Sequence, residues 1–152
     1  YVDADYAAES NDRRSVSGVA VMLGDTAIGW KSSTQRCATT ATCEAEYVAL
    51  CDASKEALLT RVVLVFLQLE LSGRRVDIFG DNGGARAIAD NPSSASRSKH
   101  VDMKLNFIRG LICTGEVRTL HVGTEQQHVD VLKKASWRRK FLVHRAAMIY
   151  FS

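Results

Sequence analysis

The stretch Val76-Asp77-Ile78-Phe79-Gly80-Asp81-Asn82 decides the fold class, because an apolar strand runs directly into two polar side chains. Its first five residues predict a compact β-strand. Before it, residues 43–71 predict one long helix, because seven positions step by three or four residues and six of them are apolar. Those seven positions are Tyr47, Cys51, Ser54, Leu58, Val62, Val65 and Leu69. A long helix followed by a compact strand is typical of layered α/β domains.

Three further strands are predicted before the helix, at residues 2–4, 16–23 and 27–31. Thr42 is the expected N-cap of the long helix. After the central strand, the pattern predicts a short helix, a longer helix, a strand and a last helix: 85–89, 99–113, 117–122 and from about 125 onward. This order predicts an α/β fold with a mixed sheet.

The composition is that of one globular domain over residues 1–152, with 46% hydrophobic and 24% charged residues. That balance excludes an intrinsically disordered chain. The net charge of +3 neither demands nor forbids a nucleic-acid partner. The densest apolar stretch, residues 62–67, is far shorter than the roughly 18 residues of a membrane span, so no membrane partner is expected.

Four cysteines, at positions 37, 43, 51 and 113, form no Cys-x-x-Cys pair. Their pattern favours a reducing compartment. The chain opens with Tyr1 and has no apolar leader, so we expect an intracellular protein (cytoplasmic, nuclear or in a virus-like particle). Because the first residues already predict structure, we also expect the chain to be a fragment of a longer one.

Four carboxylates lie where α/β sheets place their chemistry, at strand ends and at the starts of adjoining helices. They are Asp3, Glu46, Asp81 and Asp130. Converging carboxylates repel one another unless cations neutralise them, and oxygen ligands suit Mg²⁺ or Mn²⁺. Two such ions could clamp the attacking and leaving oxygens of a phosphodiester. The spacing alone favours ordinary surface charges and helix caps.

Seven motifs in order give this sequence a resemblance to a known family. They are YVDADYA at 1–7, RRSVSG at 13–18, WKSSTQ at 30–35, EAEYVAL at 44–50, DN at 81–82, SKHVD at 98–102 and EQQHVDVLK at 125–133. Together they resemble the ribonuclease H domain of copia-type LTR retrotransposon polyproteins. The resemblance covers residues 1–133 and implies a ribonuclease H-like fold, a five-stranded mixed sheet flanked by helices.

The resemblance also implies an activity, cleavage of the RNA strand of RNA–DNA hybrids with two Mg²⁺ ions, for which Mn²⁺ can substitute. Matched by position, Asp3 resembles the first-strand carboxylate that binds both metals. Glu46 resembles the helix glutamate, with Glu44 as its rival, and Asp81 resembles the aspartate of the fourth strand. Asp130 resembles the aspartate that completes the second metal site. The adjoining polymerase domain of a reverse transcriptase is an expected partner.

Other residues are candidates for supporting roles. Asp5 shares the face of Asp3 by strand alternation and is a candidate neighbour of the metal ligands. Candidates for contacts with 2′-hydroxyl groups are Thr39, Thr40, Thr42 and Asn82. Candidates for phosphate contacts are Arg13, Arg14, Arg97, Lys99 and Lys133. His128 is a possible auxiliary residue that could assist proton transfer or product release. Solvated charges and helix caps are the alternative interpretation for each.

Three features depart from the family pattern. The first strand has almost no residues before Asp3, Gly83-Gly84 stands where relatives carry a polar pair, and the resemblance fades after Lys133. Residues 134–152 are therefore assigned only as a C-terminal helix. These departures support an alternative function, a repurposed and catalytically inactive ribonuclease H-like domain that binds nucleic acid or a protein.

Overall fold

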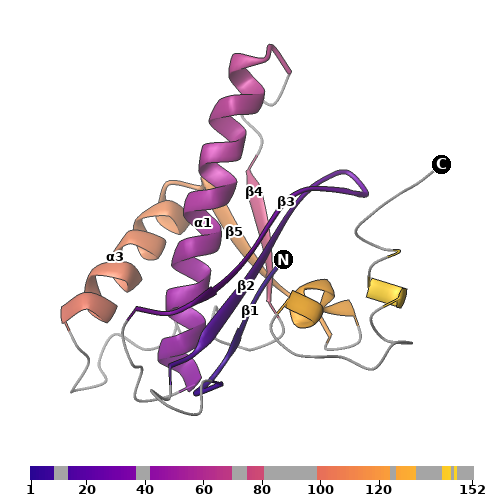
Figure 1. The fold of residues 1–152 in the computed structure, drawn as a ribbon. Coiled ribbons are helices and arrows are strands. Elements are labelled where there is room, and N and C mark those ends of the chain that lie inside the picture. Colours follow the sequence, from indigo (N-terminus) through magenta and orange to yellow (C-terminus); the bar gives the residue numbers. More distant parts are fainter. Residues whose placement is uncertain are drawn as a thin grey trace.

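The computed structural model describes residues 1–8, 14–36, 42–69, 75–80, 99–123, 126–132, 142–144 and 146, and it contains helices and strands in an α/β order (Figure 1). Its elements are β1 (Val2–Asp5), β2 (Val16–Leu23), β3 (Thr26–Thr34), α1 (Thr42–Phe66), β4 (Val76–Gly80), α3 (Lys99–Cys113), β5 (Val117–His121) and the 3₁₀ helix η2 (His128–Leu132). The predicted helix at 85–89 lies outside the described residues.

The five strands form two hydrogen-bonded groups in the part of the chain that the structure describes. β1, β2 and β3 form an antiparallel sheet, and β4 pairs with β5 in parallel. β1 lies beside β4, because a Cβ atom placed on Gly80 would be 3.8 Å from the carbonyl oxygen of Val2. The mixed α/β fold class is as predicted, but the single five-stranded sheet is here divided between β1 and β4.

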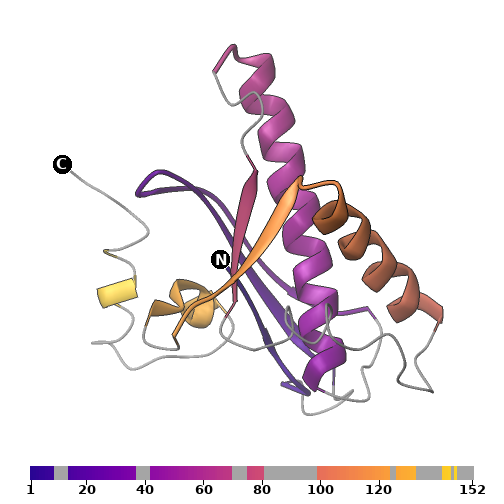
Figure 2. The ribbon, with the colours of Figure 1, turned by 180° about the vertical axis from the view of Figure 1, so that it is seen from behind.

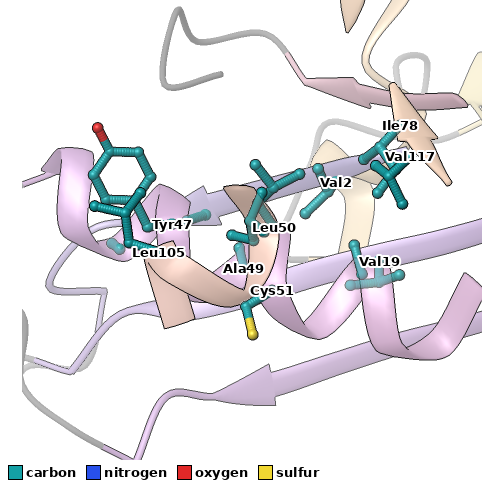
Figure 3. Close-up of a cluster of buried hydrophobic side chains, with 13 residues drawn as sticks. Val2, Val19, Tyr47, Ala49, Leu50, Cys51, Ile78, Leu105 and Val117 are labelled. Carbon is teal, nitrogen blue, oxygen red and sulfur yellow. The ribbon is translucent and has the colours of Figure 1, made fainter. Parts of the chain in front are cut away.

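The core lies between these strands and one helical layer. Figure 3 shows Val2 of β1 close to Ile78 of β4 and Val117 of β5, in the cluster that the buried part of α1 covers. α1 approaches the strands closely because small side chains, among them Ala45 and Ala49, are completely buried at their contact. α3 packs beside α1 and adds Leu105 and Ile108 to the same cluster (Figures 1 and 2).

The long helix is correctly predicted at its start but not at its end. It begins at Thr42 and ends at Phe66, where Gln68 adopts a positive φ of 61°. The N–H of Leu69 then donates to the carbonyl of Leu64, and the N–H of Gln68 donates to that of Val65, which together form a Schellman motif. The helix therefore ends five residues earlier than the predicted boundary at residue 71.

The predicted apolar face of this helix is right for its first half and wrong for its second. Tyr47, Cys51 and Ser54 are buried, as the spacing requires. Val62 and Val65 are instead exposed, as is Leu69 beyond the helix end. The reason is geometric, because the last turns of α1 extend past the ends of the strands and of α3 (Figure 1).

The last predicted helix, from about residue 125, is also different in the structure. Residues 128–132 form the short 3₁₀ helix η2 instead of an α-helix, and residues 133–141 lie outside the described part, but residues 142–144 and 146 are α-helical as predicted. By contrast, α3 ends at Cys113 as predicted, with Gly115 at a positive φ of 73°. Among the described helices, none combines the length and apolar character needed to cross a membrane.

Candidate active site

Asp3 lies on β1, the strand between β2 and β4. Its side chain is only 3% exposed, and its Oδ1 accepts a hydrogen bond of 2.7 Å from the N–H of Ala4. Its cross-strand partner is Gly18, which has no side chain and so leaves room on the face that Asp3 occupies. Asp5 shares that face by alternation and is half-buried, and its place as a neighbour of the metal ligands stays a prediction.

The first two turns of α1 bring two glutamates to the same region, because α1 packs against β1. Glu46 is half-buried, whereas Glu44 is buried. Gln35 anchors this turn, since its Nε2 donates to the Oγ of Ser17 at 2.8 Å and to the carbonyl of Ala45 at 2.9 Å. The choice of Glu46 over Glu44 as the site residue stays a prediction.

The other two predicted carboxylates are placed only through their neighbours. Asp81 lies outside the described residues, but it directly follows Gly80, which lies against Val2. Asp130 belongs to η2, which contacts β1 and β2, and its side chain lies outside the described part. The elements that carry or precede all four carboxylates therefore meet at β1.

Metal binding has to be judged from the chemistry of these residues. Within the described ranges, no group of three or more potential ligands lies together, and Asp81 and the carboxylate of Asp130 fall outside those ranges. A set made only of carboxylates suits Mg²⁺ or Mn²⁺. The deep burial of Asp3 also fits a cation, because a buried carboxylate needs compensation for its lost hydration. The donor set thus fits a divalent metal.

Two of the predicted nucleic-acid contacts can be placed with their side chains. Arg14 is exposed just before β2, and Thr42 is exposed at the first position of α1. Lys99 is the first residue of α3, with its side chain outside the described part. The remaining candidates lie outside the described residues: Arg13, Thr39, Thr40, Asn82, Arg97 and Lys133.

His128 lies in a small cluster of rings. Its ring centroid is 4.9 Å from that of Tyr1, and its Nδ1 is 3.4 Å from the Nδ1 of His144. Burial, His144 and the nearby terminal amine all lower the pKa of His128. The imidazole is therefore held mainly neutral near pH 7, the form that can accept a proton. Its auxiliary role stays a prediction.

The sequence analysis missed three buried polar residues around these elements: Gln35, Gln127 and His144. Gln127 is completely buried, and its Nε2 donates to the carbonyl of Val2 at 2.9 Å, which fastens the segment before η2 to β1. Gln35 lies in the motif WKSSTQ and Gln127 in EQQHVDVLK, so their place in these motifs could have marked them as candidates. His144 lies beyond residue 133, where the sequence offers no pattern.

Proteins similar in sequence to this chain include retrotransposon polyproteins. No protein-family model matches the chain. Over 141 residues, 93% of the chain, it is 36% identical to the retrovirus-related Pol polyprotein from transposon RE2 of Arabidopsis thaliana. It is 30% identical over the same length to that from transposon TNT 1-94 of Nicotiana tabacum. The chain spans about 10% of the length of these curated relatives.

Among solved structures, the fold is similar to that of LC11-RNase H1, an enzyme isolated from compost. One structure of that enzyme, in complex with an RNA/DNA hybrid, has a TM-score of 0.58 and 17% sequence identity, covering 87% of this chain and 90% of the other. A second has a TM-score of 0.60 and 18% identity. The chain is thus homologous over 93% of its length to the retrovirus-related Pol polyproteins of copia-type transposons, and its fold is that of ribonuclease H.

Proposed function

We propose that this domain is a metal-dependent endoribonuclease that hydrolyses the RNA strand of RNA–DNA hybrids within a retrotransposon reverse transcriptase. The observation that carries the proposal is the buried carboxylate of Asp3, on the strand where the start of α1, the end of β4 and η2 meet. The likeness in fold to an enzyme crystallised with an RNA/DNA hybrid supports the choice of substrate.

In this proposal Asp3, Glu46, Asp81 and Asp130 hold two Mg²⁺ ions, or Mn²⁺ in their place. When bound, the ions supply the charge neutralisation that phosphodiester hydrolysis requires. The protein contributes preorganisation. The hydrogen bond from the Ala4 N–H limits rotation of the Asp3 carboxylate, and the contacts of Gln35 fix the helix turn that bears Glu46.

Binding of the hybrid would rely on shape and on phosphate contacts. Arg14 and Thr42 are exposed at the ends of elements that pack around β1, so they can reach a bound backbone. Since the relatives are far longer than this chain, the adjoining polymerase domain is the proposed source of further contacts to the hybrid. The proposed place of action is inside the cell.

The test is cleavage of an end-labelled RNA–DNA hybrid with Mg²⁺ or Mn²⁺, beside duplex RNA and duplex DNA. We expect cutting of the hybrid alone. Asp3→Asn should lower the rate by at least about a hundredfold, since a metal ligand supports several kcal/mol of transition-state stabilisation. Asp77→Asn, an exposed carboxylate of β4 outside the site, is the matched control and should leave the rate unchanged.

Circular dichroism and urea unfolding would establish that the Asp3→Asn chain is folded. Undiminished cleavage by folded Asp3→Asn would contradict the proposed site. A folded wild-type chain that binds the hybrid but never cuts it, with either metal, would instead favour the repurposed binding domain.

A further inference from the structure

Three of the four predicted metal ligands lie next to one small junction beside β1. Asp3 follows Val2, and Asp81 follows Gly80. A Cβ atom placed on Gly80 would be 3.8 Å from the carbonyl oxygen of Val2. Asp130 belongs to η2, which packs beside β1 and β2 (Figures 1 and 2). The geometry of this junction therefore limits how far apart the three residues can lie.

The side chain of Gln127 joins the parts of this junction. It is completely buried, and its Nε2 donates to the carbonyl of Val2 at 2.9 Å. That carbonyl points away from β2, because the preceding carbonyl, of Tyr1, accepts from the N–H of Ala20 in β2 at 3.0 Å and carbonyls alternate along a strand. In the described residues no hydrogen-bond ladder joins β1 to β4. The Gln127 amide thus gives β1 a hydrogen bond on the side that faces β4.

The short helix η2 is held at both of its ends. Before it, the Gln127 amide fixes the chain to β1. At its last residue, the carbonyl of Leu132 accepts a hydrogen bond of 2.6 Å from the Oγ of Ser32 in β3. That second bond is exposed, whereas the bond from Gln127 is buried, where water does not compete for it, and Val129 is completely buried as well. The backbone around Asp130 is therefore located mainly by Gln127 and Val129.

The second polar atom of the same amide shows that stability alone does not account for Gln127. Its Oε1 is buried and has no hydrogen-bond partner among the described residues. A buried acceptor without a partner lowers stability, and this cost offsets the gain from the bond that Nε2 makes. An apolar side chain of equal length would fill the same space without the unpaired oxygen. The amide is therefore better explained by the position that it fixes than by the stability that it adds.

We infer that Gln127 is a positioning residue of the metal site. It acts through the backbone, because its hydrogen bond holds the turn that carries Asp130 against the strand that carries Asp3. Partners that orient metal ligands commonly change metal affinity by about 10–100-fold, because ligands bind best when they are already at the required separation. This role rests on the proposed function, since it needs a metal at these carboxylates.

The chain offers a matched pair of variants, because Gln126 and Gln127 are adjacent but Gln126 is exposed. Gln127→Met keeps the length of the side chain and removes the amide, and Gln126→Met makes the same chemical change on the surface. Binding of Mn²⁺ alone is measured by electron paramagnetic resonance of the free ion. We expect the Mn²⁺ affinity of Gln127→Met to fall at least about tenfold, and that of Gln126→Met to stay within about twofold of the wild-type value.

Cleavage of the RNA–DNA hybrid gives a second readout, which separates positioning from a general loss of structure. Gln127→Met should need at least about tenfold more Mg²⁺ for its half-maximal rate, while its rate at saturating Mg²⁺ should stay within about threefold of wild type. A merely structural role would lower the saturating rate and the urea midpoint and leave the Mg²⁺ requirement unchanged. Urea unfolding also establishes that each variant is folded.

Two results would overturn the inference. One is a Mn²⁺ affinity of folded Gln127→Met equal to that of Gln126→Met, and the other is a lower rate at saturating Mg²⁺ with an unchanged Mg²⁺ requirement. If Gln127→Met does not fold, the same criteria apply to Gln127→Asn, whose amide is one methylene group too short to reach Val2. Either result would leave the proposed function intact, whereas a wild-type chain that binds no Mn²⁺ would contradict the positioning role and the proposed metal site together.

Discussion

The two halves of α1 carry eight apolar residues each but lie in opposite environments. From Thr42 to Ser54 the helix is packed against the strands, and nine of its residues are buried. From Lys55 to Phe66 none of its residues is buried, and Phe66 at its end is 85% exposed. One continuous helix thus serves as core in one half and as surface in the other.

The difference teaches how the two halves are held. The first half has small side chains at its tightest contacts, including Ala45 and Ala49. Because they allow close approach, dispersion and the burial of apolar surface stabilise this half. The second half is tied to its neighbours by ion pairs instead. Arg61 contacts Glu116 at 2.8 Å, and Glu56 contacts Lys31 of β3 at 2.7 Å. Exposed pairs of this kind contribute little, so the halves should respond very differently to substitution.

The strongest way to break this comparison is to remove one aromatic side chain from each half. Tyr47 is 1% exposed, so Tyr47→Ala should lower the free energy of unfolding by about 3–5 kcal/mol, through lost burial and the cavity it leaves. Phe66→Ala should change it by less than about 0.5 kcal/mol, because Phe66 has little contact to lose. Urea unfolding followed by circular dichroism measures both.

A large loss for Phe66→Ala would show that the second half of α1 is packed in solution, and the comparison would fail. A small loss for Tyr47→Ala would mean that the first half tolerates a cavity, contrary to its close packing.

Added volume gives a second, smaller contrast. Ala49 is completely buried between α1 and the strands, so Ala49→Leu should destabilise the domain by about 1–3 kcal/mol through overpacking. Val63→Leu adds one methylene group on the exposed half and should be neutral within about 0.5 kcal/mol. Thermal unfolding of the two chains under one buffer distinguishes them, and equal shifts would argue against a tight helix–sheet contact.

This contrast also marks what could be predicted from the sequence. Periodicity correctly located α1, because Tyr47 and Cys51 do face the core. It could not show that Val62 is exposed, because that depends on strand lengths and on where the helix crosses them. An apolar residue has the same pattern whether or not a partner lies opposite it.

The site divides in the same way. Asp3 was chosen for its place on a strand, and it does lie on β1, whereas its role in the site stays a prediction. Gln127 was missed as a fastening of β1, because a buried amide that donates to a strand carbonyl 125 residues away leaves no local signal. The gap between β1 and β4 was missed as well, since strand order alone does not say which neighbours share hydrogen bonds.

The ends of α1 and α3 test the comparison on a smaller scale, with expected changes of about 1 kcal/mol in the free energy of unfolding. Both close with a residue at positive φ, Gln68 after α1 and Gly115 after α3. Gln68→Gly should raise the free energy of unfolding by about 0.5–1 kcal/mol, because glycine adopts this conformation without the strain of a Cβ atom. Gly115→Ala should lower it by about 1 kcal/mol. Urea unfolding measures the direction of both changes in stability. A loss of stability in Gln68→Gly would contradict backbone strain at the positive φ of Gln68.

The smallest expected effect concerns the ion pair between Lys31 and Glu56. The hydrogen bond and the charge of Glu56 raise the pKa of Lys31 above its ordinary value of 10.5. Because the folded pKa is the higher one, the stabilisation is fully present below pH 10.5 and is lost as the pH rises through the folded value. Both side chains are more than a third exposed, so Glu56→Gln should cost at most about 0.5 kcal/mol at neutral pH and less in high salt. In the Glu56→Gln variant, the free energy of unfolding should also fall less as the pH rises above 10.5, because the ion pair is already absent. A cost above that of Ala49→Leu would mean that ion pairs, and not packing, hold the second half of α1.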